Sequence, residues 1–163
     1  MQNLRVRDVM TAPVVTATPS ATLEDVARLM LAERIGSVVI VAPGEPWRPV
    51  GIVTETDFDV ADEPIPFTFF RWPKLLGSSV WSESSLEDVY ERARGRHAES
   101  IMTTPVATID AEAPLFRAVE LMLAREVKRL PVVRGDRLVG IVTRHDLLKC
   151  LAPVTFERPA GAL

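Results

Sequence analysis

An internal repeat constrains the fold of this chain more than any other feature of its sequence. When the sequence is shifted by 92 residues, residues 10–41 match residues 102–133 at 12 of 32 positions. Ordinary residue frequencies would give about two or three identities. The match resumes after a loop three residues shorter in the second copy, where Val50–Thr54 aligns with Val139–Thr143. The chain therefore contains two copies of a unit of about fifty residues.

Each copy has the pattern of a β-α-β-β-α unit. A short extended segment, 14–16 or 106–108, precedes a helix whose apolar residues recur at i, i+3, i+4 and i+7. These predicted buried positions are Leu23, Val26, Ala27 and Met30 in the first copy, and Leu115, Ala118, Val119 and Met122 in the second. Two β-branched strands should follow in each copy, at 38–41 and 50–53 and at 130–133 and 139–142. The last element is a helix that we expect to open at Thr54 or Thr143.

Local signals mark the starts of the two longer helices. Thr22 with Asp25 three residues later is a capping pattern, and Pro114 is expected at the first position of the second helix. A fifty-residue unit buries little surface alone, so the two copies should pack together. We therefore predict an α+β fold of two β-α-β-β-α units packed sheet to sheet about a pseudo-twofold axis, with ligand clefts between them.

The copies span residues 4–60 and 96–151, separated by a segment at 61–95 and followed by a tail at 152–163. The intervening segment contains three prolines with Phe67, Phe69, Phe70, Trp72 and Trp81, and is too apolar for a solvated tether. It either covers an exposed edge of the first copy or forms a dimerisation or partner surface. A linker helix is expected from about Ser85, and the tail is expected to be a loose or dimer-bracing extension.

Charge and composition exclude several function classes. The formal net charge is −3, so no global basic field would hold a nucleic acid, although a local patch in the second copy could. The only cysteine, Cys150, cannot form an internal disulfide, which fits a reducing compartment. Neither a signal-peptide pattern nor an apolar run of about 18 residues is present. We expect a cytoplasmic protein without membrane or nucleic-acid partners.

The repeated motif at the end of each copy has two possible roles. Gly51-Ile-Val-Thr-Glu-Thr-Asp57 recurs as Gly140-Ile-Val-Thr-Arg-His-Asp146. Exposed N–H groups at a helix start attract phosphate, the Thr hydroxyl can donate to it, and the Asp could bind a ribose diol. The same Thr-x-x-Asp spacing also caps a helix without any ligand. The motif by itself leaves both interpretations open.

The doubled pattern resembles a tandem pair of CBS domains, also called a Bateman module. Met-Thr-x-Pro-Val opens each copy, Leu-Pro-Val-Val forms a strand of the second, and Gly-Ile-Val-Thr-x-x-Asp closes both. The segment with Pro66-Phe67 and Trp72-Pro73 also resembles that of stand-alone bacterial CBS-pair proteins. The resemblance implies a regulatory module that binds AMP, ADP, ATP or S-adenosylmethionine between its two domains and associates as a homodimer through its helices.

The resemblance also implies which residues would bind the ligand. The hydroxyl and ribose-binding positions are Thr54 and Asp57 in the first copy, and Thr143 and Asp146 in the second. Phosphate-contacting cations would be Lys128 and Arg129, with Arg144 and His145 inside the second motif. The first copy has Gly36, Ser37 and Glu55 instead, so we predict phosphate at the second site, and an empty first site or a ligand with little phosphate charge. Adenine would lie near Thr16 and Thr108. Alternatively, these cations are ordinary solvated surface charge.

Catalysis finds no support in the sequence. His97 and His145 do not form a metal-binding spacing, and no phosphate-binding glycine loop or nucleophile elbow is present. We expect no enzyme activity, no catalytic residues, no metal and no catalytic cofactor. Two functions remain: a regulatory module that acts on a separate protein effector, and a structural dimerisation or docking protein with no metabolite ligand.

Overall fold

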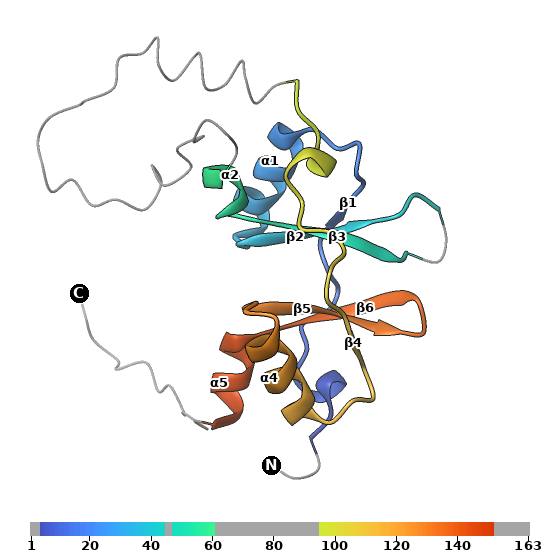
Figure 1. Cartoon of the computed structure of the whole chain (residues 1–163), viewed down its shortest axis with the longest axis vertical. Coiled ribbons are helices and arrows are strands. Elements are labelled where there is room, and N and C mark those ends of the chain that lie inside the picture. The colour runs from blue at the N-terminus through green and yellow to red at the C-terminus, as the bar shows by residue number, and fades with distance from the viewer. Residues whose placement is uncertain (1–3, 45–46, 61–94, 152–163) are drawn as a thin grey trace, which may run out of the picture. The chain divides into compact units, whose positions relative to one another are not determined.

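The computed structural model describes residues 4–44, 47–60 and 95–151, and it has an α+β fold (Figure 1). Two compact units are present, each with one three-stranded sheet. Of the described residues, those between 15 and 106 form the first-copy unit, and residues 4–14 together with residues 107–151 form the second-copy unit. Most of the aromatic segment, with the helix expected from Ser85, and the tail lie outside the described residues.

The first-copy unit places its helices on a sheet with strand order β1-β2-β3. The β1 strand runs parallel to β2, and β2 pairs antiparallel with β3, so that Ser37 lies opposite Thr54 at one end of the sheet. Its elements are β1 (Thr16–Ala17), α1 (Leu23–Glu33), β2 (Ser37–Val41), β3 (Pro49–Thr54) and α2 (Asp57–Val60).

The second-copy unit repeats this arrangement with strand order β4-β5-β6. Arg129 lies opposite Thr143 at one end, and Gly135, with a φ of +61°, forms part of the tight turn at the other. Its elements are β4 (Ile109–Asp110), α4 (Leu115–Ala124), β5 (Arg129–Arg134), β6 (Arg137–Thr143) and α5 (Arg144–Leu151).

Several predicted element boundaries differ from those observed. The extended segments lie one to three residues later than predicted, so Thr16 falls inside β1 but Thr108 precedes β4. The α2 helix begins at Asp57 rather than Thr54, because Thr54 still pairs with β2 and two turn residues follow it. Pro114 is the residue before α4 rather than its first residue, and it has extended backbone angles.

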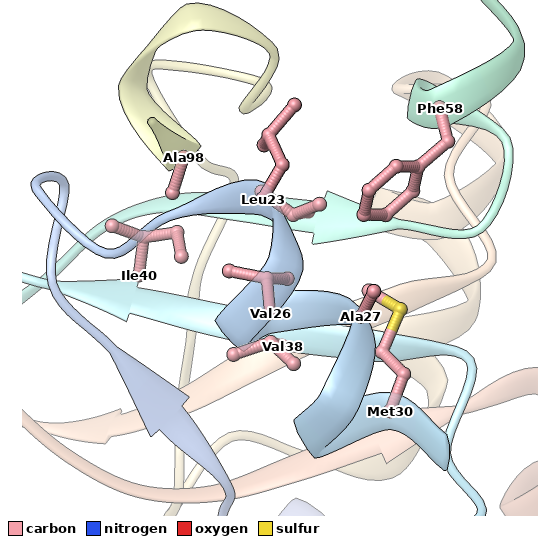
Figure 2. Close-up of a cluster of buried hydrophobic side chains, with 9 residues drawn as sticks. Leu23, Val26, Ala27, Met30, Val38, Ile40, Phe58 and Ala98 are labelled. Atoms are coloured by element: carbon pink, nitrogen blue, oxygen red, sulfur yellow. The ribbon is translucent and has the colours of Figure 1, made fainter. Parts of the chain in front are cut away.

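The apolar stripe predicted for the first helix forms the core of the first-copy unit. Thr22 Oγ1 accepts the N–H of Asp25 at 3.1 Å and thereby caps α1, as expected. The stripe then packs on β2 and β3, where Phe58 of α2 and Ala98 complete a cluster that is almost fully buried (Figure 2). Its labelled members are Leu23, Val26, Ala27, Met30, Val38, Ile40, Phe58 and Ala98.

The stripe predicted for α4 was wrong at one position. Ala118 and Met122 are buried in the core of the second-copy unit with Leu130 and Val142, but Val119 is 40% exposed. Successive helical residues are rotated by about 100°, so the residue after Ala118 lies at the margin of the buried face. The sequence pattern did not mark that margin, because Phe116 and Leu123 on the same side of the helix are apolar and yet also exposed.

Each unit includes a short segment that precedes the other copy in the sequence. The 3₁₀ turn η1 (Val6–Asp8) lies in the second-copy unit, where the Val6 N–H donates to Ala113 O at 3.0 Å (Figure 1). The turn η3 (Ala98–Ser100) lies in the first-copy unit, where the Ala98 N–H donates to Ala21 O at 2.8 Å. The two bonds occupy equivalent positions of the repeat.

The residues that follow each 3₁₀ turn pair with the edge strand of the same unit. Thr103 exchanges backbone hydrogen bonds with Ile52 on β3, and Thr11 exchanges them with Ile141 on β6. Met102 crosses Gly51, and Met10 crosses Gly140, so closely that a Cβ on either glycine would meet the methionine side chain. The compact units therefore do not coincide with the predicted domains, because residues 4–14 belong to the second-copy unit and residues 96–106 to the first. The pairing of these segments is non-local, and the sequence pattern contains no signal for it.

Ion pairs hold the N-terminal segment in the second-copy unit. Arg5 donates to the backbone oxygen of Glu112 at 2.6 Å, and Arg7 pairs with the Glu112 carboxylate. This hydrogen bond and the charge of Glu112 raise the pKa of Arg7 above its ordinary value. Arg134 approaches the same carboxylate at 3.8 Å. No helix in the described part of the chain is long and apolar enough to cross a membrane.

Candidate functional site

The carboxylate of Asp146 lies where β6 ends and α5 begins. Its Oδ2 accepts the N–H of Thr143 at 2.9 Å and the hydroxyl of Thr143 at 2.7 Å, and the Asp146 N–H donates back to Thr143 Oγ1 at 3.3 Å. Asp146 is only 6% exposed and is the buried charged residue of the described chain. These bonds form a reciprocal cap, so this part of the motif makes the bonds that the ligand-free interpretation requires.

Asp57 occupies the equivalent place in the first-copy unit and is less buried than Asp146. Its Oδ2 accepts the Thr54 N–H at 2.6 Å and the Thr54 hydroxyl at 2.9 Å, and Thr54 Oγ1 lies 2.8 Å from Thr56 Oγ1. Asp57 is half-buried, and only the four-residue helix α2 follows it. Both copies therefore orient a carboxylate with the hydroxyl and the N–H of the strand's last residue.

Three of the predicted cations gather around the second motif. The Arg144 N–H donates to the backbone oxygen of Lys128 at 3.0 Å, and Arg129 is the cross-strand partner of Thr143. The side chains of Lys128 and Arg144 are exposed, and Arg129 is half-buried. The end of the β5–β6 ladder thus brings residues 15 positions apart to one place beside a helix start, where cations favour an anion.

The first-copy unit builds the same backbone with other side chains. The Glu55 N–H donates to Gly36 O at 3.3 Å, and Ser37 lies opposite Thr54. Glu55 is exposed at the position that Arg144 occupies in the second copy. A negative charge here would oppose a phosphate group, so the two motifs share their backbone arrangement and differ in the charge of the side chains around it.

The structure does not bring all of the predicted residues together. His145 is exposed on α5, between Arg144 and Asp146. Thr16 pairs with Val39 in β1 and Thr108 precedes β4, and neither hydroxyl bonds to a Thr–Asp motif within the described residues. The assignments of His145, Thr16 and Thr108 to a ligand remain predictions.

Sequence reasoning missed one residue of the second motif. Lys149 Nζ lies 3.4 Å from Asp146 Oδ1, on the next turn of α5. The i, i+3 spacing on a helix is a signal that could have found this pair. The first copy has Val60 at the matching position, so Asp57 has no such cation. The Lys149 ammonium therefore partly offsets the buried charge of Asp146.

The donor set of these motifs suits an anion with a polyol rather than a metal. The described residues contain no group of three His, Cys, Asp or Glu side chains that could hold a metal ion. Thr hydroxyls, backbone N–H groups and cations bind phosphate oxygens, and a carboxylate accepts hydrogen bonds from a diol.

A family comparison gives this repeated geometry its context. The model of the CBS domain matches the chain twice, over residues 6–61 and 98–153. The chain belongs to the CBS-domain family. Two matches in tandem make it a CBS pair, or Bateman module. We call residues 4–14 and 96–106, each of which packs in the unit of the other copy, the crossed segments.

Archaeal relatives of this CBS pair match nearly its whole length. The uncharacterized protein MK0525 of Methanopyrus kandleri is 31% identical over 91% of this chain and 63% of its own. The uncharacterized protein MJ1404 of Methanocaldococcus jannaschii is 30% identical over 93% of this chain and 33% of its own. The CBS pair thus spans less than two thirds of the length of either relative.

Solved structures show the same fold. The CBS domain of a CBS domain-containing membrane protein from Sphaerobacter thermophilus is 34% identical, with a TM-score of 0.76 over 93% of this chain and 90% of that one. The CBS pair of MJ0100, solved with 5′-methylthioadenosine and S-adenosylmethionine, is 22% identical, with a TM-score of 0.65 over 91% and 95%. CBSX2, solved with AMP, is 21% identical, with a TM-score of 0.64 over 90% and 95%.

Proposed function

We propose that this CBS pair is a regulatory module that binds an adenosine-containing ligand, AMP, ADP, ATP or S-adenosylmethionine, at its Thr–Asp motifs and modulates a separate protein effector. The observation that carries the proposal is the cluster of Lys128, Arg129 and Arg144 beside the Thr143–Asp146 pair. The CBS pairs of MJ0100 and CBSX2, which bind such ligands in their solved structures, support the same ligand class.

The proposal assigns different roles to the groups of the second motif. Lys128, Arg129 and Arg144 would bind phosphate oxygens through charge-assisted hydrogen bonds. The Asp146 carboxylate would accept hydrogen bonds from the ribose hydroxyls, and Lys149 would move away from Oδ1 to make room for them. Binding would shift the module between two conformations only if the ligand contacts differ between them.

The first motif would contribute less to nucleotide binding. Its exposed Glu55 repels phosphate, and Gly36 and Ser37 supply no cation. This site would remain empty or hold a ligand with little phosphate charge. The distinction gives the proposal a test within one chain, because each residue of the second motif has a matched control in the first.

A docking protein without a metabolite is the second candidate, and one observation favours it. The hydrogen bonds of both Thr–Asp pairs are already satisfied within the chain, as capped turns require. If this alternative is correct, the basic side chains beside Thr143 are ordinary solvated surface charges that bind no ligand.

Calorimetric titration of the full chain with AMP, ATP and S-adenosylmethionine separates the two candidates. We expect ATP to bind, and Lys128→Gln to weaken binding about tenfold, because one charge-assisted hydrogen bond contributes about 1.5 kcal/mol or more. The control in the first copy is Ser37→Gln, next to Gly36, the residue that aligns with Lys128, and it should leave the affinity unchanged. No heat at millimolar concentrations of all three ligands would establish the docking alternative. Equal effects of the two substitutions would contradict the assignment of phosphate to the second motif.

A further inference from the structure

The two oxygens of the Asp146 carboxylate have different partners. Oδ2 accepts the N–H of Thr143 at 2.9 Å and the hydroxyl of Thr143 at 2.7 Å. Oδ1 lies 3.4 Å from Lys149 Nζ, on the next turn of α5. Thr143 therefore fixes the direction of the carboxylate through Oδ2, and Oδ1 is the oxygen that the ribose hydroxyls of a ligand would have to reach.

The ion pair between Lys149 and Oδ1 matters more to the carboxylate than to the ammonium group. The side chain of Lys149 is 64% exposed, whereas that of Asp146 is 8% exposed. An ammonium group in water gains little from one long contact on a helix surface, and its flexible four-carbon stem can carry the charge elsewhere without moving the helix. A buried carboxylate that loses its partner is destabilised more strongly. Asp146 thus needs a donor at Oδ1, whereas Lys149 can leave at little cost.

A nucleotide offers a separate partner to each member of this pair. Its ribose diol can donate to Oδ1 in place of the ammonium group. Its 5′-phosphate, which only the sugar ring and one methylene group separate from the diol, attracts that ammonium group together with the cations at the end of β6, Lys128 and Arg144. A nucleoside without phosphate offers only the diol, so it displaces Lys149 without giving it a new ionic partner.

We infer that Lys149 makes the second motif selective for phosphorylated nucleosides, an inference that rests on the proposed function. Lys149 competes with the ribose diol for Asp146 Oδ1, and it binds phosphate once the diol has replaced it. The competition weakens the binding of every ligand with a diol, and the phosphate contact more than restores it for nucleotides. The first copy has Val60 at the matching position, so its motif carries no such lysine.

Calorimetric titration with AMP and with adenosine tests the role of Lys149. The full chain carries Asp57→Ala, so that the first motif is disabled and the heat reports the second. In this background we expect AMP to bind more tightly than adenosine. Lys149→Met should weaken AMP binding about tenfold, because a charge-assisted hydrogen bond is lost, and strengthen adenosine binding about twofold, because the competing ion pair is lost. The preference for AMP should therefore fall about twentyfold.

Two further variants separate the charge of Lys149 from its effect on the fold. Lys149→Arg keeps a cation on the same helical turn and should keep most of the preference for AMP. Arg137→Met removes one exposed positive charge at the other end of β6, about 20 Å from Thr143, and should leave both affinities unchanged. Circular dichroism checks that each variant is folded.

Failure of this inference and failure of the proposed function give different results. An unchanged preference in Lys149→Met, or an equal loss of affinity for AMP and adenosine, would overturn the role of Lys149 and leave the proposed function standing. A matching loss of preference in Arg137→Met would overturn it too, because net charge rather than the contact with Asp146 would then be responsible. If neither ligand binds in the Asp57→Ala background, nucleotide binding at the second motif is refuted, and the role of Lys149 with it.

Discussion

At the end of β3 the first-copy unit presents Ser37 and Glu55, whereas at the end of β6 the second-copy unit presents Arg129 and Arg144 on an equivalent backbone. The strand registers are the same in both units, and in each unit the Asp carboxylate accepts the N–H and the hydroxyl of the Thr at the strand end. The repeat therefore preserves a framework that orients a carboxylate and a hydroxyl. The charge that surrounds this framework differs, and we propose that this difference gives each copy its own ligand preference.

The largest difference in stability that we expect between the units comes from the apolar residue that follows the aspartate of each Thr–Asp motif. Phe58 follows Asp57 and is 1% exposed, whereas the equivalent Leu147 is only partly buried. Phe58→Ala should lower the free energy of unfolding by about 3–5 kcal/mol, and Leu147→Ala by about 2 kcal/mol, because the lost contacts and the cavity scale with burial. Urea unfolding of both variants measures this. A larger loss for Leu147→Ala would contradict the difference in packing.

The caps themselves should differ by a smaller amount. Asp146→Ala leaves the N–H and hydroxyl of Thr143 without their acceptor at a buried site, which should cost about 2–3 kcal/mol. Asp57→Ala should cost about 1 kcal/mol, because Asp57 is only half-buried and water can reach its site. Thermal unfolding of the two variants, with Asp146→Asn as the isosteric control, gives the comparison. Equal losses would show that burial does not distinguish the caps.

The smallest expected effect on stability comes from the ion pair that joins the amino-terminal segment to the second-copy unit. Arg7 pairs with Glu112 in the second-copy unit, and the equivalent positions of the first-copy unit hold Glu99 and Ser20. Glu112→Gln should lower the unfolding midpoint by at most about 2 °C at low salt and by nothing measurable at 1 M salt, because exposed pairs are weak and screened. Ser20→Lys would install a reversed pair with Glu99 and raise the midpoint slightly. A salt-independent loss in Glu112→Gln would indicate a role other than an ion pair.

The sequence predicted the features that depend on neighbouring residues. The repeat, the core stripe of α1 and the Thr22 cap follow from periodicity and spacing within a few residues, and the structure confirms them. The placement of residues 4–14 was not predictable, because their partners lie about a hundred residues away. Val119 was misassigned because an apolar neighbour and an apolar core position look alike in a sequence.

Part of the candidate site was predictable for the same reason. Thr143 and Asp146 are three residues apart, and their hydrogen bonds follow from local geometry. The proximity of Lys128 and Arg129 to that pair required the correct strand register, which the repeat itself supplied. Lys149 was missed because the repeated motif ends at Asp146 and does not include the following turn of α5.

The crossed segments also set an order in which the chain can assemble during synthesis. The first-copy unit is continuous from residue 15 to residue 106, so all of its parts exist once Val106 has left the ribosome. The second-copy unit joins the first residues made to the last. Thr11 therefore cannot pair with β6, and Met10 cannot pack against it, until that strand emerges about 130 residues later in the chain. For that interval this amino-terminal segment is available to chaperones, proteases or a neighbouring nascent chain.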